Sequence, residues 1–211
     1  MSDFELGQTD RLLTTTRAVR KRLDLTRPVE PEIVLDCLRV ASQAPSGSNS
    51  QRWRWMLVAD PAKKEAIARY YRKSWKAYMA PKMALLDPDD ESSVRMTDSA
   101  RHLAEHMGEV PLLVIPTVLD LPPESTMGEA QAGFWGGVFP AVWSFQLALR
   151  SRGLGSATTT LHLNYEKEVG ALLGIPDTVK QIALVPVAYY TGTDFGAAPR
   201  RPIEEVTYWD T

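Results

Sequence analysis

The segment Phe134–Arg152 limits the possible folds most strongly, because it is the most apolar stretch of the chain and is too long for a strand. Its large side chains recur at the spacing of a helix, at Phe134, Val138, Ala141, Val142, Phe145 and Leu149. A helix that is apolar on nearly all sides has to be buried. We therefore expect a fold built around one central buried helix, which Pro140 either kinks or divides so that the longer part begins there.

Strand-like and helix-like patterns alternate along the rest of the chain. Apolar runs predict strands over Trp53–Ala59, Val110–Leu119 and Gln181–Tyr190. Periodic segments predict helices over Thr9–Thr16, Pro31–Gln43, Pro61–Met79, Thr97–Met107 and Asn164–Leu173, with a loop over Leu121–Gln131. The expected helix caps are Thr97 or Asp98 and Asn164. This order predicts an α+β fold of three layers, α-β-α, around a small sheet.

The length and composition favour one globular domain and exclude several classes of function. A chain of 211 residues fits a single domain, residues 1–211. The 24 basic and 26 acidic residues give a net charge of -2, which lacks the basic surface that nucleic-acid binding usually needs. No stretch has the length and apolar character of a membrane helix, and the sequence start does not resemble a signal peptide. We expect a cytoplasmic protein with no membrane association.

An acidic piece that contains proline, Pro81–Arg95, interrupts the helical pattern in the first half of the chain. It carries the run Asp87-Pro88-Asp89-Asp90-Glu91. A run of like charges usually forms a solvated loop, and a mobile excursion is the alternative interpretation.

Several short motifs suggest chemistries that we do not favour. The sequence His102-Leu103-Ala104-Glu105-His106 fits the H-x-x-E-H pattern of some zinc proteases, but nothing after it specifies a further ligand, and we predict no metal site. There is no G-x-G-x-x-G after a strand and no G-x-x-x-x-G-K-[ST]. Cys37 lies on the apolar face of a predicted helix, where a core role is more common than a nucleophilic one.

Four segments, in order along nearly the whole chain, resemble the FMN-dependent nitroreductase family. Residues 16–20, Thr-Arg-Ala-Val-Arg, are similar to its opening R-R-S-x-R motif, and residues 44–53 to its A-P-S-x-x-N-x-Q-P-W turn. Residues 139–155 resemble its central helix with the A-R-x-x-G-L-G ending, and residues 198–206 its R-x-P-x-E-E signature. The chain departs from these motifs at Thr16, Ala18 and Arg52, where the family has arginine, serine and proline.

The resemblance implies an intertwined homodimer with two FMN sites at the subunit interface. By matched position, Arg17, Ala18 and Arg20 lie near the flavin, and Arg200, with Arg201 beside it, holds the phosphate. Pro45, Ser46 and Asn49 come from the other chain, while Thr158 and Thr159 belong to a segment whose backbone reaches the flavin. No side chain is assigned as catalytic, because the flavin N5 carries the hydride.

The family also implies an activity: reduction of nitroaromatics, quinones or similar flat acceptors by NAD(P)H in a ping-pong cycle. Residues at about 80–107 would form a lid over the acceptor side of the flavin. Trp75 and Tyr78 are candidates for contact with a flat substrate, and core or lid packing is an equally open interpretation for them. Residues at about 194–211, with Trp209, would form a tail that wraps the partner chain. Three alternatives stay open: a reductive dehalogenase, an enzyme that fragments FMN, and a flavin-storage protein without turnover.

Overall fold

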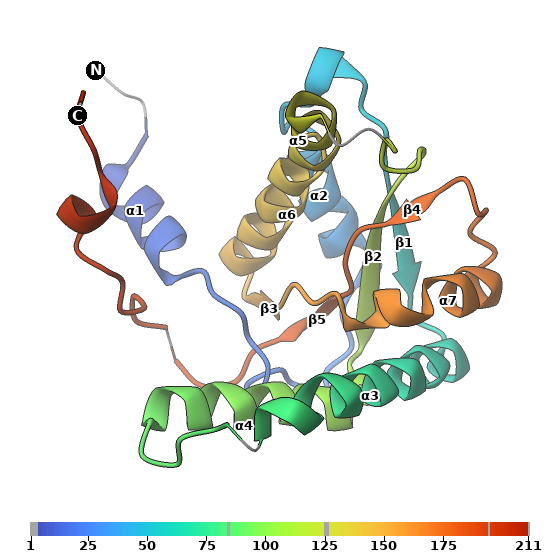
Figure 1. Cartoon of the computed structure of the whole chain (residues 1–211), viewed down its shortest axis with the longest axis horizontal. Coiled ribbons are helices and arrows are strands. Elements are labelled where there is room, and N and C mark those ends of the chain that lie inside the picture. Colours follow the sequence, from blue (N-terminus) through green and yellow to red (C-terminus); the bar gives the residue numbers. More distant parts are fainter. Residues whose placement is uncertain (1–3, 84, 125–126, 194, 211) are drawn as a thin grey trace.

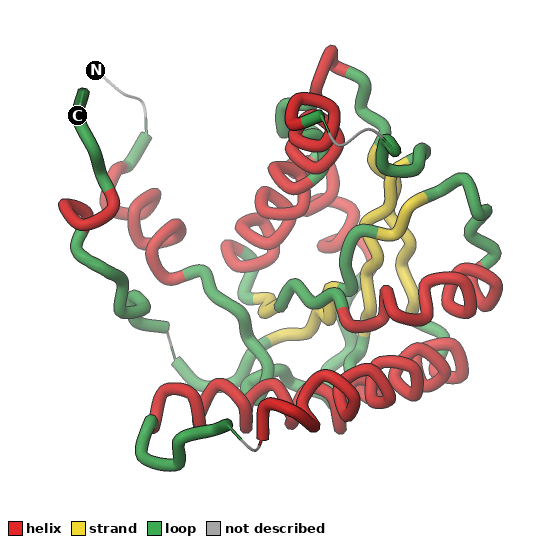
Figure 2. The backbone as a smooth tube through the Cα atoms, in the orientation of Figure 1, coloured by secondary structure: helices red, strands yellow, loops and turns green. Residues whose placement is uncertain are grey.

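An antiparallel sheet separates two layers of helices (Figures 1 and 2). The computed structural model describes residues 4–83, 85–124, 127–193 and 195–210. The strand order is β1-β2-β5-β3, and β4 pairs with β2. The strands are β1 (Trp53–Val58), β2 (Leu112–Val118), β3 (Leu154–Ser156), β4 (Lys180–Gln181) and β5 (Val185–Tyr189). The predicted α+β, three-layer fold is confirmed.

The central strand β2 shows why both faces of the sheet are covered. Its residues are all buried, and successive side chains point to opposite faces. Leu112 and Val114 pack in a core with the helices α2 (Pro31–Ala41) and α6 (Phe139–Ser151). Leu113 and Ile115 pack in a second core with α3 (Pro61–Met83), α4 (Glu91–His106) and α7 (Glu166–Leu173). The continuous apolar pattern of this strand therefore reflects burial on both sides.

The segment expected as one central helix forms two helices. Gly137 and Val138 separate α5 (Gly128–Gly136) from α6, and Pro140 occupies the first turn of α6, where its missing N–H costs nothing. The loop predicted over Leu121–Gln131 is thus wrong in its last residues. One face of α6 is buried, but Phe139 and Trp143 are 41% and 43% exposed. In a single chain, α6 is central without being buried on all sides.

The predicted acidic excursion contracts to a short loop between two long helices. Helix α3 continues past Met79 and contains Pro81 in its last turn. Helix α4 begins at Glu91 rather than at Thr97, because the Asp90 carboxylate caps it by accepting hydrogen bonds from the backbone N–H groups of Ser92 and Ser93. Caps at Thr97 or Asp98 are therefore wrong. Ala84, in this loop, lies outside the described residues.

Three smaller differences concern the second half of the chain. Asn164 does not cap α7, because it lies inside a 3₁₀ turn, Leu161–Tyr165, that leads into the helix. Strand β3 is too short to show an alternating pattern, and the sequence does not predict it. The single strand predicted over Gln181–Tyr190 forms two, since Gln181 ends β4 and β5 begins at Val185.

Both ends of the chain extend to the same side of the molecule. Helix α1 (Leu6–Thr15) and the tail lie on the left in Figure 1, away from the sheet. The tail contains a 3₁₀ turn, Ile203–Val206, and leaves Tyr208 and Trp209 about four-fifths exposed, at 80% and 81%. The limits of the predicted tail, Asp194 and Thr211, lie outside the described residues. None of the helices in the described ranges is both long and apolar enough to cross a membrane.

Candidate functional site

A cavity of about 500 Å³ lies between the helices α3 and α4 and the segment that follows β3. Three of the residues predicted from the sequence, Arg20, Thr158 and Thr159, line it. These residues come from distant parts of the chain, so the fold has brought them together. The cavity is therefore the candidate site.

The walls of the cavity are the facing sides of two helices. Helix α3 contributes Tyr71, Trp75, Tyr78 and Lys82, which recur every three or four residues and so share one face. Helix α4 contributes side chains at the same kind of spacing, Ser93, Met96, Thr97 and Ala100. The predicted substrate-contact candidates Trp75 and Tyr78 both lie in this wall.

Thr159 is fixed in the floor of the cavity by the sheet. Its backbone N–H donates to the carbonyl oxygen of Leu184 at 3.0 Å, and the Leu184 N–H donates back to the Thr159 carbonyl at 2.7 Å. The Thr159 hydroxyl lies 2.8 Å from the phenol oxygen of Tyr71. Burial raises the pKa of Tyr71 despite this hydrogen bond, so the phenol remains protonated near neutral pH.

Thr158 is held by a residue that the sequence did not reveal. Its hydroxyl donates to Gln146 Oε1 at 2.8 Å, and Gln146 Nε2 donates to the Ser156 hydroxyl at 3.1 Å. Gln146 is a buried residue of α6. An amide on the buried face of an otherwise apolar helix was the available signal, since a buried amide needs hydrogen-bonding partners.

The segment that carries Arg17, Ala18 and Arg20 runs beside β3. The Val19 N–H donates to the Ser156 carbonyl at 2.8 Å, and Val19 is buried. Arg20 is partly buried at the cavity, whereas Arg17 and Ala18 are exposed. Arg17 Nη1 donates to the carbonyl of Gly196 at 3.2 Å, which links this segment to the tail.

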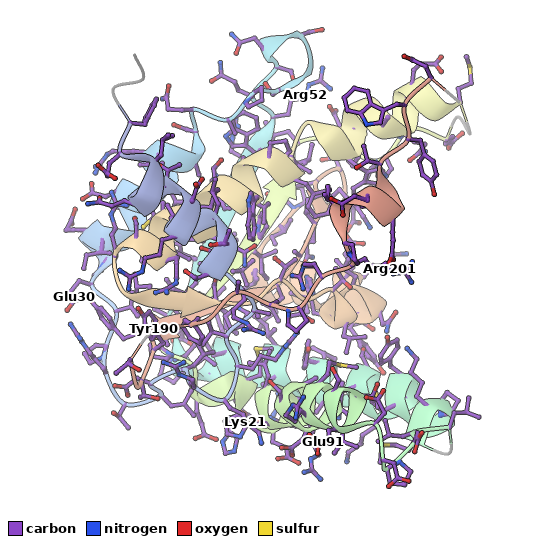
Figure 3. The ribbon with its side chains drawn as sticks, turned by 90° about the vertical axis from the view of Figure 1, so that its left-hand side faces the viewer. Lys21, Glu30, Arg52, Glu91, Tyr190 and Arg201 are labelled. Atoms are coloured by element: carbon purple, nitrogen blue, oxygen red, sulfur yellow. The ribbon has the colours of Figure 1, made fainter. Side chains whose placement is uncertain are left out.

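The predicted residues Pro45, Ser46 and Asn49 lie elsewhere in the chain. They belong to a turn that is held internally: Ser46 Oγ accepts the Gln51 N–H at 3.1 Å, and Asn49 Oδ1 accepts from Gln51 Nε2 at 2.9 Å. Neighbouring residues of this turn line a separate cavity of about 560 Å³ beside α5. In Figure 3, Arg52 at the end of the turn lies at the opposite end of the molecule from Lys21 and Glu91.

The two predicted phosphate ligands, Arg200 and Arg201, are exposed in the tail. Arg200 Nη1 donates to the carbonyl of its neighbour Pro199 at 2.9 Å, and neither arginine is among the residues that line the cavity. Figure 3 shows Arg201 on the tail. One chain therefore assembles part of the predicted site and leaves the turn and the tail arginines apart from it.

The residues of the H-x-x-E-H motif and the cysteine do not line the candidate cavity. The rings of His102 and His106 lie with centroids 4.4 Å apart and are tilted by 40°, and His106 Nδ1 lies 2.8 Å from Glu109 Oε1. Among the described residues, no three His, Cys, Asp or Glu side chains are grouped so that they could hold a metal ion. Burial raises the pKa of the Cys37 thiol to about 11, so this residue is a core residue and an inert thiol.

The groups around the cavity fit a flat, anionic cofactor. Arg20 provides a guanidinium, Thr158 and Thr159 provide hydroxyl and backbone groups, and the α3 wall provides aromatic surface. Guanidinium groups suit phosphate and other oxyanions, and aromatic faces suit a planar ring. This donor set matches the polar and planar parts of a flavin nucleotide.

Comparison with known proteins finds a matching family and several relatives. The model of the Nitroreductase family matches residues 13–189. Curated relatives include an iodotyrosine deiodinase of Nematostella vectensis, 25% identical over 193 residues, which cover 90% of this chain and 70% of the relative. A protein named NADH dehydrogenase from Thermus thermophilus is 28% identical over 207 residues, which cover 94% of this chain and 97% of that one.

Solved structures show the same fold. An oxidised iodotyrosine deiodinase bound to FMN and 3-iodo-L-tyrosine has a TM-score of 0.71 and 25% identity, with 93% of this chain and 96% of that one covered. The FMN-dependent nitroreductase NfnB of Mycobacterium smegmatis in complex with NADPH has a TM-score of 0.69 and 19% identity, with 98% and 100% covered.

Proposed function

Because the chain belongs to the nitroreductase family, we propose that it binds FMN and acts as an NAD(P)H-dependent oxidoreductase on flat aromatic acceptors. One observation carries the proposal: the fold gathers Arg20, Thr158 and Thr159 in a cavity walled by aromatic side chains. Two relatives add support, since one is named a NADH dehydrogenase and a structure of similar fold is an FMN-dependent nitroreductase with NADPH.

FMN would be held by residues from three parts of the sequence. Arg17 and Arg20 would lie near the ribityl chain and the N1/C2 edge, with Ala18 beside them, and the 158–159 segment would face the ring. Arg200, with Arg201 beside it, would hold the phosphate. When bound, FMN supplies the redox chemistry, by accepting hydride from NAD(P)H and passing electrons to the acceptor.

The chain itself provides orientation and electrostatics. With FMN bound in this cavity, the Arg20 guanidinium would supply a positive charge that stabilises the anionic reduced form. The hydrogen bond between the Thr159 hydroxyl and the Tyr71 phenol connects the floor of the cavity to the α3 wall. The aromatic wall against which a substrate would lie is therefore held at a fixed distance from the floor. The helices α3 and α4 limit access of water, in the manner of a lid over about residues 80–107.

We further propose that a second copy of the chain completes the site. In Figure 3, Arg52 at the end of the turn with Pro45, Ser46 and Asn49 lies at the opposite end of the molecule from Lys21, the residue next to Arg20. Across an interface, the turn of one chain can meet Arg20 of the other. Large apolar side chains are exposed where such an interface needs them, on α6 at Phe139 and Trp143 and in the tail at Tyr208 and Trp209. Such a clasped dimer makes both α1 and the tail part of the interface.

Mixed dimers test this arrangement. The variants Arg20→Ala and Asn49→Ala should each weaken FMN binding alone. Mixed dimers that contain one chain of each variant regain one site with both native residues, and so should bind FMN with native affinity at half of their sites. Absence of any recovery, or a monomer in light scattering, would contradict the two-chain site.

The activity is tested by anaerobic reduction. The FMN-loaded protein should be bleached by NADH or NADPH and should regain its colour when a nitroaromatic or a quinone is added. A protein that binds FMN but is bleached by neither coenzyme would instead be a flavin-storage protein. Arg200→Ala should weaken FMN binding about 10- to 100-fold, the effect of losing one charge-assisted contact; unchanged affinity would place the phosphate elsewhere.

Reductive dehalogenation is a second candidate, because deiodinases are among the curated relatives and among the structures of the same fold. Release of iodide from an iodinated phenol by the reduced protein would favour it. Electron transfer to nitroaromatics without dehalogenation would favour the first candidate.

A further inference from the structure

The charged side chains in the described lining of the candidate cavity are all basic. Among its described lining residues the charged side chains are Arg20 and Lys82, and none is an aspartate or glutamate. The remaining lining is aromatic, apolar or hydroxyl-bearing, as at Trp75, Tyr78 and Met96. Arg20 is assigned above to the flavin, so Lys82 is the charged side chain of this lining that remains for a substrate. A substrate beside it meets a positive charge and flat apolar surface, and the described lining has no carboxylate to receive an ammonium group.

Two acidic residues of the lid, Asp98 and Asp90, are engaged in contacts outside the cavity lining, and Glu91 pairs with Arg95. Asp98, on α4, pairs with Lys21 and accepts a hydrogen bond from Arg101 at 2.6 Å, and these bonds lower the pKa of its carboxyl. It lines a different, more apolar hollow between α3 and α4. Asp90 is occupied as the cap of α4. These carboxylates do not offset the positive charge that faces the ligand.

Lys82 lies where its ammonium group can contact a ligand in the cavity. It lies in the last turn of α3, is exposed, and its Nζ stands 3.5 Å from the centroid of the Tyr78 ring. Within the described part of the chain it makes no ion pair, while its neighbour in the cavity wall, Tyr78, is 47% exposed. A flat ligand lying against Tyr78 would bring its edge near this ammonium group.

We propose that the cavity selects aromatic substrates that carry a carboxylate or phenolate, and that Lys82 is the residue that determines this specificity. This proposal rests on the FMN binding of the proposed function, but it does not require that NAD(P)H reduces the flavin. A neutral analogue gains the stacking without the charge pairing. A zwitterionic amino acid gains the carboxylate contact and brings an ammonium group that finds no carboxylate in the lining.

Three probes of similar size separate these cases: 4-nitrobenzoate, 4-nitrobenzyl alcohol and 4-nitro-L-phenylalanine. Each is titrated into the oxidised, FMN-loaded protein, and its affinity is read from heat of binding, so no turnover is needed. We expect 4-nitrobenzoate to bind about tenfold more tightly than either of the other two, with a preference that falls at high salt.

Variants of two lysines on α3 test whether Lys82 causes the preference for the anion. Lys82→Gln should abolish the preference for the anion, and Lys82→Glu should reverse it. Lys76→Gln, which removes a lysine of α3 that does not line this cavity, is the matched control and should keep the preference. Circular dichroism and FMN content confirm that each variant is folded and loaded.

Equal affinity of the native protein for the anion and the alcohol would overturn the proposal. An anion preference that survives Lys82→Gln would overturn the role of Lys82. Failure of the proposed function has a different signature, because a protein that NAD(P)H does not reduce can still bind 4-nitrobenzoate selectively, and that result would sustain the selection of anions alone.

Discussion

Replacement of His162 by leucine should make the stability of the fold less sensitive to acid. His162 lies in the 3₁₀ turn before α7 and is fully buried, with a relative exposure of 0%. Neither ring nitrogen has a hydrogen-bond partner among the described residues. Burial, and then the positive charge of Lys180, lower the pKa of this imidazole from its ordinary value of 6.5 to about 3.

The sign and size of the effect follow from this shift. Below pH 6.5 the unfolded chain binds a proton at His162 that the folded chain does not accept, so the stability present above that pH is lost as the pH falls toward 3. At a pH of about 5 the protonated imidazole exceeds the neutral one about 30-fold in the unfolded chain, which corresponds to a loss of about 2 kcal/mol.

Urea unfolding at pH values of about 7.5 and 5 measures this loss. On going from the higher to the lower pH, the free energy of unfolding of the native protein should fall by about 2 kcal/mol more than that of His162→Leu. This difference corresponds to a shift of about 1 M in the urea midpoint. Leucine has a similar volume and sacrifices no hydrogen bond, so the two proteins should have similar stability at the higher pH. Protein and FMN concentrations are held constant, because ligand and partner binding both add to apparent stability.

A matched control is His106→Gln, at a histidine whose side chain reaches solvent. Comparison with this variant separates the effect of the buried imidazole from that of removing any histidine. If His162→Leu loses as much stability on acidification as the native protein does, the imidazole is not held neutral, and the reasoning from its burial is wrong.

Three further predictions concern the packing around the site. Gly155→Ala should lower stability by about 1–3 kcal/mol and weaken FMN binding, because a new Cβ would meet the Val19 Cβ at 3.0 Å and displace the Arg20 segment; calorimetry and FMN titration measure both. Lys64→Ala should cost about 1–3 kcal/mol in urea unfolding, since its buried Nζ donates to two backbone carbonyls, at 2.7 and 3.2 Å, while a neutral result would mean that water replaces it. Cys37 should not react with a thiol reagent until the protein is unfolded, and rapid reaction of the native protein would contradict its burial.

The sequence predicted those elements whose pattern is set by burial. Strands β1 and β2 follow from continuous apolar runs, and the split at Pro140 was one of the two expected outcomes. The start of α4 was missed because the residues around Asp90 have the charge pattern of a solvated loop, although the same carboxylate caps the helix. Charge alone does not distinguish these two roles.

The site was predictable in part for a related reason. Arg20, Thr158 and Thr159 were inferred from motifs and do meet in one cavity. The role of Gln146 depends on where α6 lies relative to Ser156 and Thr158, which no local pattern contains. The basic charge of the cavity lining depends likewise on the packing of α3 against α4, and so appears only in the folded chain.

Titration of the flavin-free protein with FMN is the most direct test of the central claim that this chain is a flavoprotein. We expect FMN binding to quench the flavin fluorescence and the quenching to saturate when FMN and protein chains are present in equal amounts. Arg20→Ala should weaken this binding, and Arg69→Ala, at an exposed position of α3 outside the cavity, should not. Quenching that does not saturate, or binding that Arg20→Ala leaves unchanged, would contradict the account.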